Sequence, residues 1–403
     1  MNAMKILYHH RTVSKDGQFV HIDELTRQLR ALGHELVIVS PAFTEQDDFS
    51  GEGGFVTRLR QSLPRWMSEF LEFCYCFVAF FKLRSALKTH RPDCLYERYN
   101  LFLPSGIWIK KLYGIPFVSE VNAPLLDERT KFEGVGLPRF ARWTEHYVWR
   151  NADVVLPVTK VLADRIMREG VDSSKIVVIH NGIDVNRFAE PPDVEAAKEK
   201  LGLTGKTVLG FTGFMREWHH LERVVEKVAA DDTGRRFALL VGDGPARESI
   251  EKRASELGVS DRVRITGVVD RASVFDYVAA FDIALQPNVV EYASPLKMFE
   301  YMVLAKAIVA PDTANIREIL TDGVDCAMFR PGDTRDFYTK IDDLLADDER
   351  RARLQQAARR TVFDKGFTWQ ENARRVTGLC ADLVAARQGI QSSSWTDEQS
   401  GRR

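Results

Sequence analysis

The chain has 403 residues, which is long for one ordinary domain, and a formal net charge of −1. Nucleic-acid-binding domains are usually strongly basic, so this charge balance gives no support for a nucleic-acid partner. Hydrophobic residues make up 45% and charged residues 28% of the chain, proportions typical of a globular protein with a full core. The five cysteines are scattered and lack zinc or redox spacing, so we expect reduced thiols in a cytoplasmic protein.

No segment has the pattern of a signal peptide or a membrane-spanning helix. Residues 4–9 form a short apolar run that leads into polar residues, unlike the long apolar core of a signal peptide. The most apolar stretch, residues 70–81, is interrupted by Glu72 and is shorter than the roughly 18–20 residues that a spanning helix needs.

The first half of the sequence alternates between short apolar runs and amphipathic segments. The predicted strands cover residues 5–8, 36–40, 94–97, 117–121, 154–157 and 176–179. Such runs are typical of a parallel sheet that is buried on both faces. Between the first two, residues 18–32 carry Ile22, Leu25 and Leu29 at helical spacing, and Gly33 ends the helix. This strand–helix–strand opening favours a doubly wound α/β sheet.

The second half repeats the same alternation. Strands are predicted at residues 208–211, 237–241, 262–266, 283–286, 307–310 and 327–329, and helices at 219–229, 247–257, 273–280, 295–304 and 317–320. A turn at Asn181-Gly182 and a proline-rich linker near 190–193 separate the halves, so we expect domains at 1–185 and 186–368. The polar tail, 389–403, is predicted to be disordered.

The start of the predicted helix at 295–304 is the most informative segment. Ser294 suits the N-cap and Pro295 the first helical position, so the N–H groups of Leu296 and Lys297 point out of the helix start. Glu300 follows one turn later on the same face. This pattern suits a sugar nucleotide, with its diphosphate at the helix start and its ribose on the carboxylate. The alternative is an ordinary capped surface helix with a solvated Lys–Glu pair.

The same segment resembles the donor-site signature of glycosyl transferases group 1, the retaining glycosyltransferase family 4, in its Ser-Pro-Leu-Lys variant. Other motifs of that family occur in order: His180-Asn-Gly-Ile-Asp184, Phe211-Thr-Gly-Phe-Met-Arg-Glu-Trp-His219, Val241-Gly-Asp-Gly-Pro245, Ile265-Thr-Gly-Val268, Asp282-Ile-Ala-Leu-Gln-Pro287, and Asp322-Gly323 with Pro331-Gly-Asp333. The resemblance implies the α/β GT-B fold, two Rossmann-like doubly wound domains that face a central cleft. It also implies that a C-terminal helix, 369–388, returns to the N-terminal domain.

The resemblance implies which residues of the second domain contact the donor. Gly213 would let the backbone approach the diphosphate, Arg216 and Lys297 would supply positive charge, Glu300 would bind the ribose, and Val268 would meet the base.

Three positions depart from the family pattern. Phe214 and His219 replace the usual Arg and Lys of the phosphate clamp, and Tyr292 stands where the family has the Glu that contacts the donor sugar. Ser294 could meet sugar hydroxyls through its backbone. His219, in turn, could simply belong to the first turn of a helix that packs on the core.

In the first domain, Gly17 could bring its N–H near the donor phosphate, or could belong to a plain turn. Asn122 stands where many relatives carry a His beside the reacting sugar, and an amide cannot act as a general base. Glu120, the segment 96–98 and the segment 10–11 are further candidates for the cleft, or else form strand-end salt bridges. No metal-binding motif is present, so we expect metal-independent chemistry and no cofactor besides the donor substrate.

The implied reaction is a retaining, same-face transfer from a nucleotide-diphosphate sugar, with UDP favoured over GDP. Arg216, Lys297 and the helix N-terminus would stabilise charge on the departing diphosphate. Family association suggests a glycan or lipid-linked acceptor in bacterial cell-surface polysaccharide or glycolipid synthesis. Residues 64–91 combine aromatic and basic side chains, as in a helix on the inner membrane surface, although a core-packing helix has a similar pattern.

Two other functions remain open from the sequence. One is a sugar-nucleotide epimerase on the same scaffold, against which the Ser-Pro-Leu-Lys segment argues. The other is a degenerate relative that binds a sugar nucleotide or glycan as a sensor or scaffold. Phe214, His219 and Tyr292 favour this second alternative, together with Ala305 and Ala307 at places where relatives often have Gly and Pro.

Overall fold

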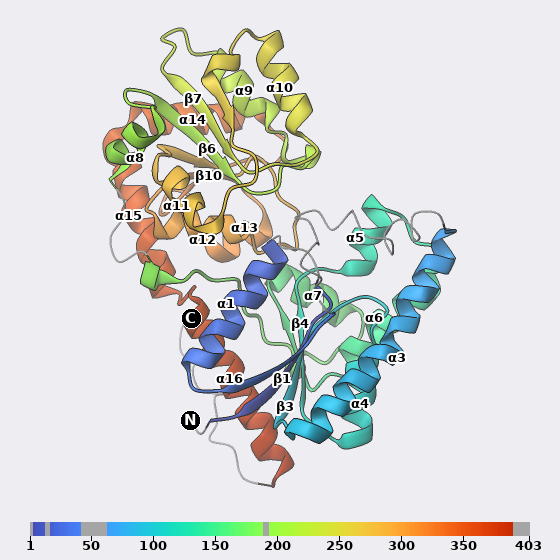
Figure 1. The fold of residues 1–403 in the computed structure, drawn as a ribbon. Coiled ribbons are helices and arrows are strands. Elements are labelled where there is room, and N and C mark those ends of the chain that lie inside the picture. Colours follow the sequence, from blue (N-terminus) through green and yellow to red (C-terminus); the bar gives the residue numbers. More distant parts are fainter. Residues whose placement is uncertain (1–2, 13–16, 42–62, 188–192, 390–403) are drawn as a thin grey trace. The chain divides into compact units, whose positions relative to one another are not determined.

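A computed structural model describes residues 3–12, 17–41, 63–187 and 193–389, and the chain forms two units (Figure 1). Unit 1 comprises Met1–His180 and Trp369–Arg403, and unit 2 comprises Asn181–Thr368. The division therefore falls at Asn181, whereas the sequence placed it after residue 185. The difference arises because Ile183 donates its N–H to the Phe367 carbonyl (3.1 Å) and thereby joins unit 2.

Unit 1 is built on a five-stranded parallel sheet with the order β2-β1-β3-β4-β5. Its strands are β1 (Lys5–His9), β2 (Glu35–Val39), β3 (Cys94–Arg98), β4 (Phe117–Val121) and β5 (Val154–Pro157). Every residue of β3 and β4 is buried, including the polar Glu97, Arg98, Ser119 and Glu120, as expected for central parallel strands covered on both faces. The strand predicted at 176–179 is wrong: Ile176 forms only an isolated bridge with Val155.

Helices cover both faces of this sheet (Figure 1). They are α1 (Gly17–Ala31), α3 (Arg65–His90), α4 (Ser105–Tyr113), α5 (Leu125–Phe132), α6 (Pro138–Asn151), α7 (Lys160–Arg168) and α16 (Trp369–Arg387), with a short 3₁₀ turn at Ser173–Lys175. Ala373 and Val376 of α16 share one buried cluster with Ile22 and Leu25 of α1. The C-terminal helix is therefore an integral part of unit 1.

Unit 2 is built on a six-stranded parallel sheet with the order β11-β10-β9-β6-β7-β8. Its strands are β6 (Thr207–Thr212), β7 (Arg236–Val241), β8 (Val263–Ile265), β9 (Ile283–Leu285), β10 (Ala307–Pro311) and β11 (Ala327–Phe329). The chain builds outward in one direction from β6 to β8 and then in the other from β9 to β11. The strand order therefore reverses between β6 and β9, which is the position where open α/β sheets bind ligands.

The helices of unit 2 enclose two buried clusters, one on each face of the sheet. They are α8 (Val194–Leu201), α9 (Glu222–Ala229), α10 (Arg247–Glu256), α11 (Arg271–Ala279), α12 (Leu296–Val303), α13 (Ala314–Ile319), α14 (Thr334–Ala346) and α15 (Asp348–Asp364), with 3₁₀ turns at Val185–Arg187, Glu217–His219 and Ser260–Arg262. The single helix predicted at 219–229 is broken, because His220 adopts a left-handed conformation with φ of 53° between a 3₁₀ turn and α9. Helices α14 and α15 were not predicted.

No helix in the described ranges has both the length and the apolar character needed to cross a bilayer.

Candidate functional site

The site lies at the switch point of unit 2, where the loop after β6 meets the start of α12. Gly213 follows β6 with a φ of 123°, a conformation that favours glycine. A Cβ added there would lie 3.1 Å from Nζ of Lys297 and 3.2 Å from its Cε. The fold therefore brings together a glycine loop and a lysine that are far apart in sequence.

Lys297 holds its ammonium group over an aromatic face. Its Nζ lies 3.6 Å from the ring centroid of Phe211, a cation–π contact that the sequence analysis did not identify. Within the part of the chain that the structure describes, this ammonium makes no hydrogen bond or ion pair. Burial lowers the pKa of Lys297 to about 7, and the nearby Glu300 carboxylate opposes that shift. The site thus contains a positive charge that lacks an anionic partner in direct contact.

Glu300 lies one helical turn beyond Lys297, and the two are electrostatically coupled. Burial raises the pKa of Glu300, while Arg271 and Lys297 act in the opposite direction. Its carboxylate makes no hydrogen bond or ion pair to any other described residue. It is therefore available to accept hydrogen bonds from a ligand.

The expected capping role of Ser294 is wrong. Helix α12 begins at Leu296, Pro295 precedes it in an extended conformation, and no side chain caps the helix. The buried Ser294 hydroxyl instead accepts the N–H of Asn181 (3.1 Å), and the Asn181 amide donates to the Ser294 carbonyl (2.6 Å). This pair fixes the segment before α12, while the first N–H groups of the helix stay without a side-chain cap and suit an anion.

His219 also packs against Phe211, and its ring contacts the backbone of Arg216. His219 is buried, its Nδ1 accepts the Arg216 N–H (3.2 Å), and its ring packs edge-on against Phe211 with centroids 4.9 Å apart. Burial, assisted by Lys297 and Arg216, lowers the pKa of His219 to about 2. Because Nδ1 accepts, Nε2 carries the proton of the neutral ring. Position 219 therefore offers a neutral N–H donor.

The Arg216 side chain is exposed, and its guanidinium lies 5.0 Å from the ring centroid of Phe214. It forms no ion pair among residues 193–389. Phe214, one of the departures from the family pattern, thus makes a cation–π contact with Arg216.

Two further glycines, absent from the predicted site, bring the loop after β7 against the loop after β6. A Cβ on Gly242 would lie 2.3 Å from the Gly213 carbonyl oxygen, and one on Gly244 would lie 2.3 Å from that of Met215. The Met215 N–H donates to the Asp243 carbonyl (2.8 Å). The Gly-Asp-Gly motif was the signal for this contact, since only glycine permits such close packing of two loops.

Val268 follows β8 beside these loops. Gly267, with a φ of 71°, forms a bridge with Gly242, and the Gly242 N–H donates to the Thr266 hydroxyl (3.0 Å). The side chain of Val268 is 53% exposed. An exposed apolar side chain at this strand end can pack against the flat face of a base.

The loop that carries Tyr292 is held by a residue that the sequence analysis missed. The fully buried Asn315 donates its amide to the carbonyls of Val290 (3.1 Å) and Ala293 (2.7 Å). Tyr292 is half-buried and Glu291 is exposed. Asn315 therefore fixes the backbone that leads to Ser294 and Leu296, and the half-buried Leu296 begins α12.

Gly17 and Asn122 belong to unit 1. Gly17 is the first residue of α1, and the loop before it, residues 13–16, lies outside the described residues. Asn122 follows β4, and its amide donates to the Glu120 carboxylate. The structure therefore gathers nine of the eleven predicted site residues in unit 2 and places these two at β-strand and helix ends of unit 1.

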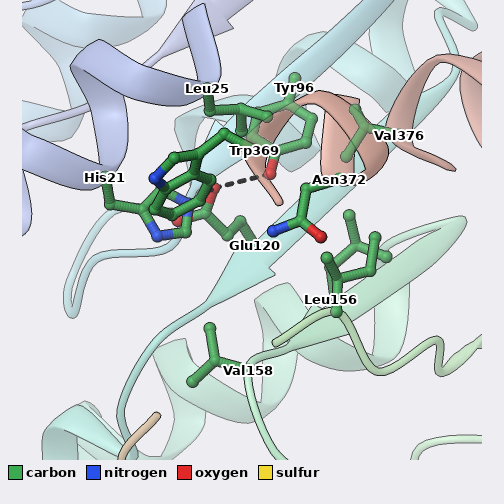
Figure 2. A pocket seen from close by; sticks show the side chains of 10 residues that line it. His21, Leu25, Tyr96, Glu120, Leu156, Val158, Trp369, Asn372 and Val376 are labelled. Carbon is green, nitrogen blue, oxygen red and sulfur yellow. Dashed lines mark hydrogen bonds and ion pairs between the residues drawn. The ribbon is translucent and has the colours of Figure 1, made fainter. Parts of the chain in front are cut away.

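Glu120 is the centre of a buried polar network in unit 1 (Figure 2). It accepts hydrogen bonds from Tyr96 (2.6 Å), Arg98 (2.7 Å) and His21 (3.0 Å). Burial alone would raise the pKa of Glu120, but His21 and Arg98 hold it well below its usual range. For Glu120 and Arg98 the strand-end salt bridge is thus the arrangement found, and this carboxylate is unsuited to act as a proton acceptor.

A small, mainly apolar cavity borders this network (Figure 2). His21, Leu25, Trp369 and Asn372 form part of its wall, together with Glu120. The Trp369 ring packs edge-on against His21, with centroids 4.8 Å apart, and fixes its orientation toward the carboxylate. The cavity is therefore part of the packing of α16 against the sheet.

In the described ranges, no group of three or more His, Cys, Asp or Glu side chains is arranged to hold a metal ion. His9 pairs its Nδ1 with Oε2 of Glu97 at 2.6 Å inside the core of unit 1.

Comparisons with known proteins identify the family and the fold. Residues 15–187 match the model of Glycosyltransferase Family 4, and residues 206–347 match that of Glycosyl transferases group 1. The chain is 26% identical over 261 residues to an alpha-D-kanosaminyltransferase of Streptomyces kanamyceticus, an alignment that covers 62% of this chain and 66%, just under two thirds, of that relative. It is 29% identical over 391 residues to a D-inositol 3-phosphate glycosyltransferase of Geodermatophilus obscurus, covering 93% of this chain and 83% of that protein.

Among solved structures, Anabaena HepE in complex with UDP and glucose is similar with a TM-score of 0.68. The sequence identity is 15%, and the alignment covers 94% of this chain and 100% of the HepE chain. At this identity the similarity shows the fold alone.

Proposed function

The chain belongs to glycosyltransferase family 4, the glycosyl transferases group 1 with a GT-B fold, and we propose that unit 2 binds a nucleotide-diphosphate sugar, UDP-linked rather than GDP-linked. One observation carries the proposal: the Lys297 ammonium, without an anionic partner in direct contact, lies against the Gly213 loop at the start of an uncapped helix. That UDP is the nucleotide bound by HepE favours uridine.

The donor would be recognised piece by piece. Its diphosphate would contact Lys297, Arg216 and the first N–H groups of α12, where charge and helix dipole act together. Glu300 would accept hydrogen bonds from the ribose hydroxyls, and Val268 would pack against the base.

The reaction is proposed to be a metal-independent transfer with retention of anomeric configuration. As the bond from sugar to diphosphate breaks, negative charge grows on the departing oxygen. Lys297 and Arg216 stabilise that charge, and the neutral Nε2–H of His219 adds a hydrogen-bond donor beside them. The acceptor oxygen forms the new bond to the sugar on the same face, and its proton passes to the departing diphosphate, because the Asn122 amide can orient a hydroxyl but cannot take a proton.

The acceptor is proposed to be a glycan or lipid-linked sugar of bacterial cell-surface polysaccharide or glycolipid synthesis, used in the cytoplasm or at the inner face of the membrane. The exposed aromatic residues of α3 support the membrane-linked acceptor. A small polyol acceptor is the competing choice, because relatives are named as inositol phosphate glycosyltransferases.

The test is thermal shift of the purified chain against a panel of nucleotides and nucleotide sugars. Lys297→Ala and Glu300→Ala are compared with Lys252→Ala, an exposed lysine on α10 outside the site. We expect one nucleoside diphosphate to stabilise the wild type and the Lys252 variant, and to lose most of that effect in the two site variants.

Stabilisation by none of the nucleotides would contradict the donor site. Binding of a sugar nucleotide without hydrolysis or transfer to any acceptor in a matched panel would favour a sensor or scaffold instead. Conversion of the donor into an epimeric sugar would favour the epimerase.

A further inference from the structure

Helix α3 of unit 1 has both of its carboxylates on its inner side. Glu69 is buried and accepts the N–H groups of Gly136 (2.9 Å) and Leu137 (2.7 Å). Glu72 is buried and pairs with both nitrogens of the Arg129 guanidinium (2.8 and 3.1 Å) and with Arg11 (3.0 Å). The acidic groups of this helix are thus satisfied inside the unit.

The outer side of α3 is apolar instead. Trp66 is 54% exposed and Phe81 is 61% exposed. Between them, Phe70 and Phe77 lie on the same stripe of the helix, and Leu71 and Val78 lie beside it; all four are exposed. At 1.5 Å per residue the stripe is about 22 Å long. Large apolar side chains in such a row are unusual on a surface that faces water alone.

The aromatic surface continues onto two neighbouring helices. The Trp108 ring of α4 lies 5.6 Å from that of Phe77, measured between centroids. The Phe140 ring of α6 lies 4.7 Å from Phe73 and 5.7 Å from Trp143, which is itself exposed. Three helices of unit 1 therefore contribute to one continuous patch, and Figure 1 shows α3 along the outside of this unit.

The charges around this patch are basic. Within α3, Arg65, Lys82 and Lys88 are exposed, and its two acidic residues are the buried ones described above. Lys111 of α4 and Arg142 of α6 are also exposed. A second copy of the chain placed on the patch by a two-fold axis would bring these like charges together, whereas a surface of anionic headgroups would neutralise them.

We propose that this patch of α3, α4 and α6 binds the surface of a lipid bilayer that contains anionic headgroups. The aromatic side chains insert at the boundary between headgroups and acyl chains, and the surrounding Lys and Arg side chains contact lipid phosphates. This deepens the proposed function, on which it rests for the location at the membrane, and its test requires neither donor nor acceptor.

The experiment is flotation of the full-length protein with vesicles. One set contains phosphatidylcholine alone, and the other contains phosphatidylcholine with about one third phosphatidylglycerol. We expect the wild type to float with the anionic vesicles only, and less so as salt is raised. A Trp66→Ser/Phe70→Ser/Phe81→Ser variant should bind at least tenfold more weakly. Lys82→Glu/Lys88→Glu should lose the preference for phosphatidylglycerol.

The matched control is Phe363→Ser, an aromatic side chain that is 49% exposed on α15 of unit 2 and should leave flotation unchanged. The UDP-induced thermal shift of each variant reports folding and the donor site separately from membrane binding. Absence of wild-type flotation with anionic vesicles would overturn the proposal, as would flotation of the triple serine variant equal to that of the wild type. A dimer in light scattering that the triple variant abolishes, without vesicle binding, would assign the patch to self-association.

Discussion

The ammonium group of Lys297 is partly buried, and few groups around it stabilise its protonated form. Burial lowers its pKa to about 7, and the Phe211 ring and the Glu300 carboxylate stabilise the charged form only in part. An anionic ligand would supply the missing partner, so binding and protonation are linked at this residue.

The affinity for UDP should therefore fall as pH rises above 7. Between pH 7.5 and 9 the phosphates are already fully ionised, since their last pKa is about 6, and the charged fraction of Lys297 falls by up to tenfold per pH unit. We expect the Kd from calorimetry to rise by nearly that factor. In the Lys297→Arg variant the side chain stays charged, so the Kd of this variant for UDP should change little between pH 7.5 and 9. Equal slopes in the two proteins would contradict this role of Lys297.

Glu145 of unit 1 is a second buried carboxyl group, and here the effect is on stability. Burial raises its pKa to about 7 from an ordinary 4.5, against hydrogen bonds from the Leu126 N–H and the Tyr99 hydroxyl. The folded state then binds the proton more tightly than the unfolded state. Stability is lost as pH rises from about 4.5 to about 7, by up to roughly 3 kcal/mol.

Glu145→Gln should remove this loss. We expect the variant to unfold at a higher urea concentration than the wild type at pH 8 and to lose that advantage at pH 5, because the amide remains neutral throughout. Glu248→Gln, at an exposed position on α10, should show no such dependence. An advantage of Glu145→Gln that is the same at both pH values would be explained by packing instead of titration.

At the scale of elements, α12 begins without a side-chain cap and ends in a Schellman motif, in which the Ala305 N–H donates to the Met302 carbonyl (3.0 Å) and the Lys306 N–H to the Tyr301 carbonyl (2.9 Å). Asn181 and Asn315 fix the segment before it, as described above. At its other end, Ala305 has a φ of 50°, a left-handed conformation that costs a non-glycine residue roughly 1 kcal/mol. Glycine adopts this conformation without that cost, so the strain follows from the residue type at position 305.

Ala305→Gly should therefore stabilise the protein by roughly 0.5–1 kcal/mol, less the larger entropy of the unfolded glycine chain. Ala307→Gly provides the control, because Ala307 is buried in strand β10 and has an ordinary strand backbone. This substitution should destabilise the protein by about 1 kcal/mol. Urea unfolding of both variants measures the two effects. Destabilisation by Ala305→Gly would show that the Ala305 methyl packing outweighs the backbone strain.

For the whole molecule, each of the two units has its own sheet and its own buried clusters. All the donor-contacting residues proposed here except Gly17 and Asn122 lie in unit 2. A ligand that binds these residues should stabilise unit 2 against unfolding more than it stabilises unit 1.

In calorimetry we expect two unfolding transitions, of which UDP shifts one. At a concentration of about 100 Kd the gain is about 2.7 kcal/mol. Glu145→Gln should move the other transition at pH 8, and Lys297→Ala should abolish the UDP shift. A single transition that both changes affect equally would show that the units unfold together.

The strands were the most predictable elements. Residues 94–97 and 117–121 are mostly apolar, and a central parallel strand buries both of its faces, so pattern and environment largely coincide. The polar members Glu97, Ser119 and Glu120 are buried as well. The run at 176–179 shows the limit of this reasoning. All four of its residues are apolar, but only Ile176 forms a bridge with β5, while Val177 and Ile179 each donate a single hydrogen bond to it (3.0 and 3.1 Å).

By itself the sequence determined the α/β class, the parallel strands, the order of family motifs and the basic and acidic residues at 297 and 300. These follow from local pattern, which a chain carries wherever it folds. Only the tertiary structure decided that Ser294 pairs with Asn181, that Phe211 lies under the Lys297 ammonium, and that α3 turns its carboxylates inward. Each of these depends on a partner far away in sequence, and local propensity contains no information about such a partner.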